Sequence, residues 1–494
     1  MRRPWLLIAL ALTLGCDDGD DDVIRDPDLD DASAPDAAAD SAAADLALPD
    51  LALPDLALPD LALPDDGLAD LGPADYSIPP PPALPPPVAC DAARPPVVMA
   101  HGFLAAGDTW AAHVARFAAN GHCADRYHAF DWNTLAMDAD HVAALDAFID
   151  AVRARHGAEQ VDLMGHSAGG RLGYDYLADP ARAAKVRAYV HTGSFPNDGP
   201  PTPEGAATRT LNLWSDGDRA VPGADIPGVD NVRLDGVDHY AVATAPAAFE
   251  AVYAFLYGAP PATAARPPAE IPVVAGRVLT LGENTPVAAA IVDLWPLDPA
   301  TGQRLGDAPR ARFISDATGA WGPFAAEPDR PYEIHVRPQG ARPVRYYRPP
   351  FAHSDPLVYL RTLPGPASLA GLLLSQISFS ADGTVMVVFS ATRAIIHGQD
   401  DLRIDGASVL TEALAPADET LIALFVYDQR GDGQPGATNP LFEQFPFLQM
   451  LDLPLAADPT AHVEVGLGAQ TLRIPRWPAD PEGAIIAVFD PTAE

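Results

Sequence analysis

The residues with the clearest chemical potential in this 494-residue chain form the pentapeptide Gly165-His166-Ser167-Ala168-Gly169. It follows an apolar segment and opens a helical one, and Gly-x-Ser-x-Gly in that context is typical of a sharp turn that presents a nucleophilic serine. The flanking glycines are expected because the turn is too tight for side chains at those positions. The pentapeptide alone also fits an ordinary glycine-rich turn, so the interpretation of Ser167 depends on partner residues.

Two further motifs supply the partners that a serine nucleophile needs. Asp218 lies just past a predicted strand, within Asp216-Gly217-Asp218-Arg219-Ala220-Val221-Pro222, and His239 follows the last strand of the same region. A histidine base oriented by a carboxylate activates serine, and Ser, Asp, His is one of the known chain orders of such a triad. We therefore predict Ser167 as nucleophile, His239 as base and Asp218 as the acid. Asp198, one strand earlier, is the alternative acid.

Short apolar strands alternate with helices between residues 96 and 258, which predicts an α/β fold with a six-stranded, doubly wound, mostly parallel sheet. Strands are expected at 96–101, 127–131, 160–164, 186–191, 210–214 and 231–234. Helices are expected at 109–120, 139–156, 169–177 and 246–257, with Asp108 as N-cap of the first.

Residues 94–258 resemble small bacterial and archaeal lipases of the α/β-hydrolase superfamily. The resemblance is carried by Gly165–Gly169, by Val97-Val98-Met99-Ala100-His101-Gly102-Phe103 and by Leu234-Asp235-Gly236-Val237-Asp238-His239. It implies a serine carboxylester hydrolase that works through an acyl-enzyme without metal or cofactor. It also implies that the backbone N–H groups of Phe103 and Ala168 form the oxyanion hole.

The C-terminal part, residues 271–494, resembles the β domain of two-domain archaeal-type lipases, in which that domain helps to hold long-chain lipid. The segments Tyr346–Phe351 and Tyr427–Gly433 carry this similarity. The residues themselves predict a Pro/Ala linker at 259–270, a prealbumin-like sandwich at 271–362 and a second β unit at 363–494, which begins with a strand at 370–379. The apolar segment Pro440–Leu448 is a candidate wall for an acyl chain.

Asp428 and Asp432 are spaced as in a calcium loop, but Arg430 occupies a position that should hold a neutral or acidic ligand. We expect a simple turn there and predict no metal, with a calcium loop as the alternative.

The N-terminus predicts export. Arg2 and Arg3 precede a short apolar segment, and Thr13-Leu14-Gly15-Cys16 resembles a bacterial lipobox, so residues 1–16 are a lipoprotein signal peptide with Cys16 as the lipidated residue. An ordinary cleaved signal is the alternative.

Residues 17–95 form an Asp/Pro-rich linker with four Leu-Ala-Leu-Pro-Asp repeats. We expect a protein anchored to a bacterial membrane, at the outer membrane or cell surface, or secreted.

The net charge of −36 excludes a general nucleic-acid binder, because such proteins need a basic surface. Nineteen Asp and one Arg between Asp17 and Asp75 supply half of that charge, so the folded part is only mildly acidic. Cys90 and Cys123 each precede a neighbouring strand of the predicted sheet, and export permits a disulfide between them; two unrelated thiols are the alternative.

The sequence thus predicts a lipid or ester substrate, and a triacylglycerol lipase in particular. A short-chain carboxylesterase or polyester depolymerase would use the same triad. The alternative of another class is a catalytically inert binding or adhesion lipoprotein. The sequence does not indicate an oligomeric state.

Overall fold

The structure, a computed structural model, describes residues 81–366, 368–375, 377–417, 420–436, 442 and 447–491. The predicted signal peptide 1–16, the lipobox Cys16 and most of the linker 17–95 lie outside these residues. The described residues belong to one compact unit. Within them, no helix is both long and apolar enough to cross a bilayer.

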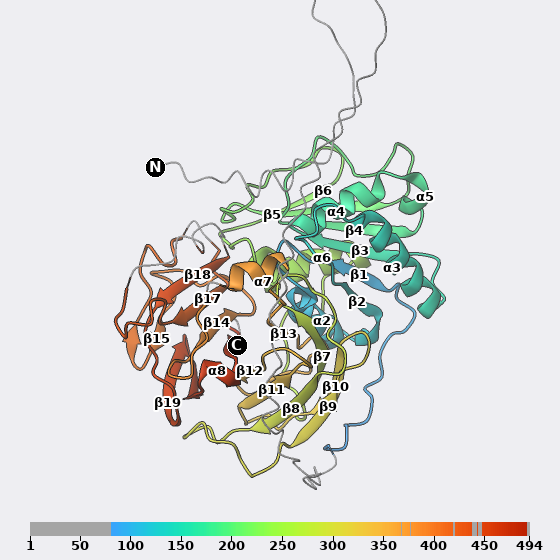
Figure 1. The fold of residues 1–494 in the computed structure, drawn as a ribbon. Coiled ribbons are helices and arrows are strands. Elements are labelled where there is room, and N and C mark those ends of the chain that lie inside the picture. The colour runs from blue at the N-terminus through green and yellow to red at the C-terminus, as the bar shows by residue number, and fades with distance from the viewer. Residues whose placement is uncertain are drawn as a thin grey trace, which may run out of the picture. The chain divides into compact units, whose positions relative to one another are not determined.

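A six-stranded parallel sheet with the order β2-β1-β3-β4-β5-β6 forms the N-terminal region, as the strand–helix alternation predicts (Figure 1). Its strands are β1 (Val97–Ala100), β2 (Tyr127–Phe130), β3 (Val161–His166), β4 (Val186–Thr192), β5 (Arg209–Ser215) and β6 (Asp230–Leu234). β1 and β3 are fully buried, which is why their sequences are almost continuously apolar.

Helices cover both faces of this sheet because successive strand residues point to opposite sides. Val97 and Met99 pack with α2 (Ala111–Ala119) and α6 (Pro246–Tyr257). Val98 and Ala100 pack instead with α3 (His141–His156) and α4 (Ala168–Leu177). The short helix α5 is Pro180–Ala183, and single 3₁₀ turns lie at Gly107–Trp110, Ala124–Arg126 and Ala241–Ala243.

The predicted N-cap role of Asp108 is wrong. A 3₁₀ turn at Gly107–Trp110 precedes α2, which begins only at Ala111, and no side chain caps it. The Asp108 carboxylate instead binds the guanidinium of Arg361 through two hydrogen bonds of 2.6 and 2.8 Å. This charge-assisted pair is the stronger interaction for a carboxylate, and it joins the N-terminal region to the C-terminal one.

Cys90 and Cys123 are joined by a disulfide that closes a separation of 33 residues. The adjoining residues Asp91 and His122 form a parallel bridge just before β1 and β2, so the disulfide lies at the amino ends of two neighbouring strands.

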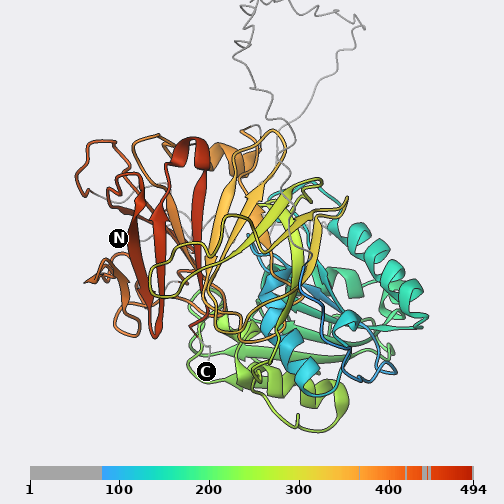
Figure 2. The ribbon, with the colours of Figure 1, turned by 90° about the horizontal axis from the view of Figure 1, so that it is seen from below.

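The described residues of the C-terminal region form three β-sheets, which Figures 1 and 2 show beside the α/β region. The three-stranded sheet has the order β10-β7-β13, the eight-stranded sheet β18-β17-β14-β21-β12-β11-β8-β9 and the four-stranded sheet β16-β15-β19-β20. Their strands are β7 (Val273–Thr280), β8 (Ile291–Pro296), β9 (Ala311–Ile314), β10 (Ala320–Ala325), β11 (Tyr332–Arg337), β12 (Val344–Arg348), β13 (Leu360–Thr362), β14 (Met386–Ser390), β15 (Leu402–Ile404), β16 (Ala407–Ser408), β17 (Ala423–Tyr427), β18 (Leu448–Asp452), β19 (Asp458–Leu467), β20 (Gln470–Arg476) and β21 (Ala484–Phe489). A short helix, α8 (Ala479–Glu482), precedes β21.

The segments 271–362 and 363–494 share the eight-stranded sheet, because β12 of the first pairs in parallel with β21 of the second. The three-stranded sheet packs on one half of it and the four-stranded sheet on the other. The strand predicted at 370–379 is wrong. The structure has a helix, α7 (Leu369–Leu374), whose first turn is capped by the Ser368 hydroxyl accepting from Gly371 N–H.

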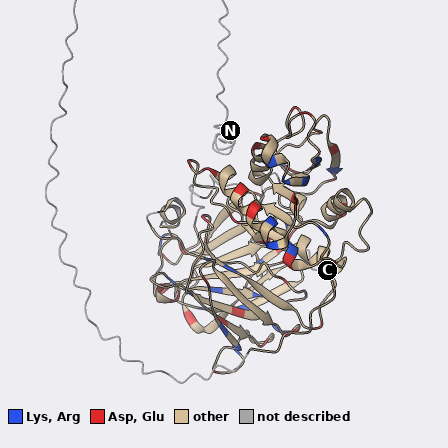
Figure 3. Cartoon of the chain, turned by 90° about the vertical axis from the view of Figure 1, so that its right-hand side faces the viewer, with Lys and Arg blue, Asp and Glu red and all other residues tan. Residues whose placement is uncertain are grey.

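Acidic and basic residues lie side by side on the helices of the folded part (Figure 3). This mixture agrees with the assignment of much of the net charge to the linker.

Candidate active site

Ser167 stands at the turn between β3 and α4 in a backbone conformation that is rare for a residue with a side chain. Its φ and ψ are 53° and −119°. Such a conformation costs about 1–3 kcal/mol and persists only where the surroundings enforce it. The residue is 9% exposed and lines a cavity, so the strain presents its hydroxyl to that cavity.

Close backbone packing explains the two glycines around this serine. A Cβ at Gly165 would lie 2.3 Å from the carbonyl oxygen of Gly169, and a Cβ at Gly169 would lie 2.4 Å from that of Ala100. Both distances are too short for non-bonded atoms. The pattern Gly-x-Ser-x-Gly is therefore a steric requirement of this turn.

His239 and Asp218 form a buried hydrogen-bonded pair. The Nδ1 of His239 lies 2.7 Å from Oδ2 of Asp218, and the side chains are 3% and 1% exposed. The other carboxylate oxygen accepts from the backbone N–H groups of Ala220 and Val221 at 3.0 and 2.8 Å. Asp218 is thereby fixed as an acceptor, so His239 carries its proton on Nδ1 and keeps Nε2 for a proton from the nucleophile.

His166, next to the nucleophile, holds the His239 loop. Its Nε2–H donates to the backbone carbonyl of His239 at 2.9 Å, and the two rings lie 4.8 Å apart. Burial, aided by the neighbouring His239, lowers the pKa of His166 well below its usual value, so its ring is neutral.

The loop after β1 and the start of α4 carry the two N–H groups predicted for an oxyanion hole. Leu104 N–H donates to Thr134 Oγ1 at 3.0 Å and Ala105 N–H to Gly102 O at 3.2 Å. Within the part of the chain that the structure describes, the N–H groups of Phe103 and Ala168 make no such bond. Phe103 also lines the cavity that contains Ser167.

That cavity has a volume of about 160 Å³, and residues of both the α/β region and the C-terminal region line it. Ser167 and His239 line it, although no hydrogen bond joins them within the described residues. On its C-terminal side the cavity is lined by apolar residues of α7 and the eight-stranded sheet, including Ala370, Leu374, Val387, Phe389, Ala423, Phe425, Ile486 and Val488. Phe442, Phe447 and Leu448, from the predicted wall segment, line it as well; the other residues of Pro440–Leu448 lie outside the described residues.

The C-terminal region also contacts the loops that carry the predicted site residues. The Phe447 ring stacks on His239 at 6.0 Å, and Ala394 N–H donates to Asp238 beside that histidine at 3.2 Å. Asn284 donates to the loop that contains Phe103. No local motif in the sequence marks Phe447, Ala394 or Asn284, since each lies more than 150 residues from its partner.

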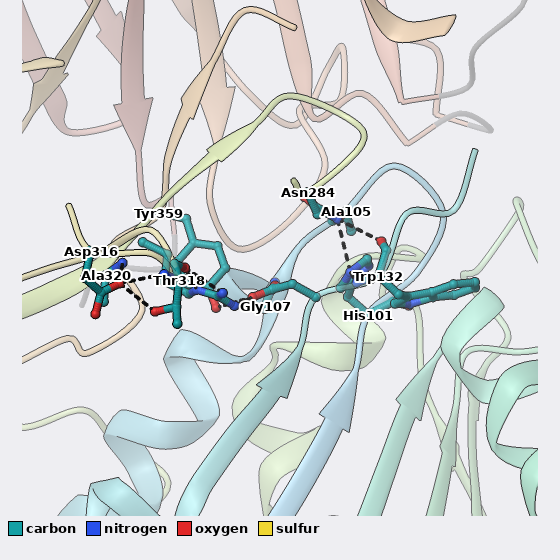
Figure 4. A network of polar contacts seen from close by, with 11 residues as sticks. His101, Ala105, Gly107, Trp132, Asn284, Asp316, Thr318, Ala320 and Tyr359 are labelled. Carbon is teal, nitrogen blue, oxygen red and sulfur yellow. Dashed lines mark hydrogen bonds and ion pairs between the residues drawn. The ribbon is translucent and has the colours of Figure 1, made fainter. Parts of the chain in front are cut away.

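A second interdomain contact lies beside that of Asn284 (Figure 4). Oδ2 of Asp131 accepts from Arg277 at 2.6 Å and from the Tyr359 hydroxyl at 2.9 Å, and Oδ1 accepts from Gly107 N–H at 2.8 Å. Arg277 is held in turn by the Thr318 carbonyl. The loops after β1 and β2 are therefore fixed from the C-terminal side.

Two alternatives from the sequence lie away from the site. Asp198 is exposed and makes no contact with His239 among the described residues. The Asp428 carboxylate accepts N–H groups of Gly431 and Gly433 at 2.8 Å each, while Arg430 pairs with Asp432. This is a hydrogen-bonded turn, and no cluster in the described ranges has the three or more acidic, histidine or cysteine ligands that a metal would need.

Comparison with known protein families finds three matching segments of the chain. Residues 95–219 match the model of the alpha/beta hydrolase fold and residues 271–363 that of the lipase C-terminal domain. A further C-terminal domain model matches residues 391–491. No curated protein matches the chain.

Solved structures similar to the chain include three bacterial and archaeal proteins. The mature lipase BlEst2 of Bacillus licheniformis is 15% identical, with 34% of this chain and 95% of that chain covered and a TM-score of 0.28. The carboxylesterase CesB of Bacillus subtilis is 13% identical, with 35% and 86% covered and a TM-score of 0.27. A predicted CIB-like hydrolase of Thermoplasma acidophilum is 16% identical, with 34% and 89% covered and a TM-score of 0.28.

The parallel sheet and the family model give the N-terminal region the α/β-hydrolase fold. Residues 271–363 are similar to the lipase C-terminal domain.

Proposed function

We propose that this protein is a serine lipase that cleaves long-chain acyl esters, triacylglycerols among them, through an acyl-enzyme. The observation that carries the proposal is the joint position of Ser167 and His239 on an apolar cavity whose wall comes mainly from the C-terminal region. Each buried CH₂ of an acyl chain contributes about 0.8 kcal/mol, so such a wall favours long chains.

The chemistry follows from the hydrogen bonds of the site. The Ser167 hydroxyl attacks the ester carbonyl carbon and its proton passes to His239 Nε2, while Asp218 stabilises the resulting imidazolium through Nδ1–H. The N–H groups of Phe103 and Ala168 stabilise the oxyanion. The alcohol then leaves with the proton from His239, and water, activated by the same histidine, hydrolyses the acyl-enzyme to the free acid.

A chain-length series tests this function. We expect hydrolysis of p-nitrophenyl esters with a higher kcat/KM for chains of twelve to sixteen carbons than for butyrate, and release of fatty acid from emulsified triacylglycerol. A serine-directed fluorophosphonate should label the wild type and not Ser167→Ala. A strict preference for acetate or butyrate would support a short-chain esterase instead, and absence of any labelling or turnover would support the inert binding protein.

We further propose that the mature protein is lipid-anchored at Cys16 and that residues 17–95 hold the enzyme away from the membrane. The lipobox-like Thr13–Cys16 and the Asp/Pro-rich composition support this. Mass spectrometry of the N-terminal peptide from a bacterial host should find a diacylglyceryl group on Cys16, and Cys16→Ser should release the protein from membranes. An unmodified Cys16, or cleavage elsewhere, would refute the anchor.

A further inference from the structure

Asn284 belongs to the C-terminal region, yet its side chain reaches the loop that carries the proposed oxyanion donor. We infer that Asn284 is a positioning residue for the N–H of Phe103, so that docking of the C-terminal region supports turnover of every ester, short ones included. The inference rests on the proposed function and adds to it a role that is independent of acyl-chain length.

The Asn284 side chain is 4% exposed and its amide nitrogen faces three acceptors (Figure 4). Nδ2 lies 2.7 Å from Ala105 O, 3.1 Å from Trp132 O and 3.2 Å from His101 Nε2. Two of the three are carbonyl oxygens, which identifies the amide nitrogen as the atom that faces them. One side chain thus ties the loop after β1 to the loop after β2.

His101 transmits this contact toward Phe103. Its Nε2 also accepts from Trp132 N–H at 3.2 Å, so the ring proton is on Nδ1, which donates to Gly102 O at 2.9 Å. Burial lowers the pKa of His101, which keeps the ring neutral and this arrangement intact. Ala105 N–H donates to the same Gly102 oxygen at 3.2 Å.

The planar Gly102–Phe103 peptide bond links the position of the Gly102 carbonyl to the orientation of the Phe103 N–H. In a planar trans peptide the N–H points opposite to the C=O of the same unit. With Gly102 O fixed by His101 and Ala105, the N–H of Phe103 is fixed on the opposite side of the peptide plane. Asn284 holds two of the three groups involved, His101 and Ala105.

The turn that carries Asn284 is itself well defined. Asn284 has φ of 55°, a left-handed conformation that asparagine and glycine tolerate better than most residues. Its N–H donates to Thr280 O at 3.1 Å, and Thr280 N–H donates to Thr285 O at 2.9 Å. Asparagine therefore serves both the turn and the contact, and Asn284→Gly would keep the backbone while removing the amide.

The test compares three full-length variants on p-nitrophenyl butyrate. Asn284→Asp keeps the shape but removes the donor, and Asn284→Gly removes the whole side chain. Thr244→Val is the matched control, because it removes an interdomain hydrogen bond, from Thr244 Oγ1 to Thr392 O, that does not touch the loop after β1. Thermal midpoints measured in parallel identify any variant that is merely unfolded at the assay temperature.

We expect both Asn284 variants to lose at least about tenfold in kcat with KM changed less than about twofold, since a displaced oxyanion donor weakens the transition state and not substrate binding. Thr244→Val should stay within about twofold of wild type in kcat. Unchanged kcat in a folded Asn284→Gly, a loss confined to KM, or an equal loss in Thr244→Val would each overturn the inference. A wild type inactive on all esters would instead refute the proposed function.

Discussion

At the scale of single residues, Asp218 illustrates how a carboxylate is fitted to one task. One oxygen accepts two backbone N–H groups and the other accepts from His239, so rotation of the carboxylate would break at least one of these bonds. Asp198, by contrast, is exposed.

Asp218→Asn should therefore lower kcat on any cleaved ester by about 10⁴, because an amide at this position favours the wrong tautomer of His239. Asp198→Asn should remain close to wild type. Steady-state kinetics with both variants decides between the two acids, and a larger loss in Asp198→Asn would reverse the assignment.

At the scale of elements, the turn between β3 and α4 depends on its glycines. A methyl group at Gly165 would overlap the Gly169 carbonyl at 2.3 Å, and overlap with backbone cannot be relieved by a rotamer change. We expect Gly165→Ala to lose activity and at least about 2 kcal/mol of stability. Gly199→Ala, where a Cβ meets nothing within 4 Å, is the control. Thermal unfolding checks both, and equal midpoints would contradict the steric argument.

The disulfide joins the starts of two neighbouring elements, β1 and β2, and closes a separation of 33 residues. Cross-linking a loop of this length restricts the unfolded chain and contributes about 2–4 kcal/mol. Titration of the denatured, unreduced protein should find no reactive thiol at Cys90 or Cys123, and reduction should release both. Cys90→Ala should lower the unfolding midpoint. Two reactive thiols in the mature protein before reduction would refute the bond.

The sequence predicts the parallel sheet well because strand and helix periodicities are local, and the motif Gly-x-Ser-x-Gly is a local steric requirement. It predicts α7 wrongly because a short apolar run fits a strand or a helix equally well, and the Ser368 cap decides in favour of helix. It does not indicate a role for Asn284, because that role depends on a contact with His101, which lies 183 positions away in the sequence. Contacts between distant regions of a chain produce no periodic pattern in the sequence, so they cannot be predicted from it.

At the scale of the whole molecule, buried histidines make stability depend on pH. Burial lowers the pKa of His122 and His191 to about 4 and that of His113 well below its usual value. The unfolded chain, with histidine pKa near 6.5, then binds more protons. The free energy of unfolding is therefore unaffected by these histidines above about pH 6.5, and it decreases as the pH falls from 6.5 toward 4. Asp162, whose pKa burial raises to about 6, opposes this trend as a single group.

His113→Phe tests this dependence, because His113 lies among Trp110, Phe117 and Phe249, with its Nδ1 lacking a partner among the described residues. The variant should gain stability relative to wild type by about 1.4 kcal/mol for each pH unit below 6.5. Urea unfolding at pH 7.5 and 5.5 measures the difference. An equal effect at both pH values would show that His113 does not contribute to the acid sensitivity.

The acyl cavity also belongs to the whole molecule, since both regions of the chain build it. Val387 of β14 lines it and is 8% exposed, so a larger side chain there would occupy space proposed for a long acyl chain. Excluding two CH₂ groups from burial costs about 1.6 kcal/mol, or more than tenfold in kcat/KM. Val387→Phe should therefore reduce kcat/KM for p-nitrophenyl palmitate at least about tenfold and leave that for the butyrate ester within about threefold.

The control is Ile314→Phe, which adds a similar ring away from the cavity, at a position of β9 that is 67% exposed. It should change kcat/KM for neither ester. Equal losses on both esters in Val387→Phe would mean that the residue supports the fold and that the long chain binds elsewhere.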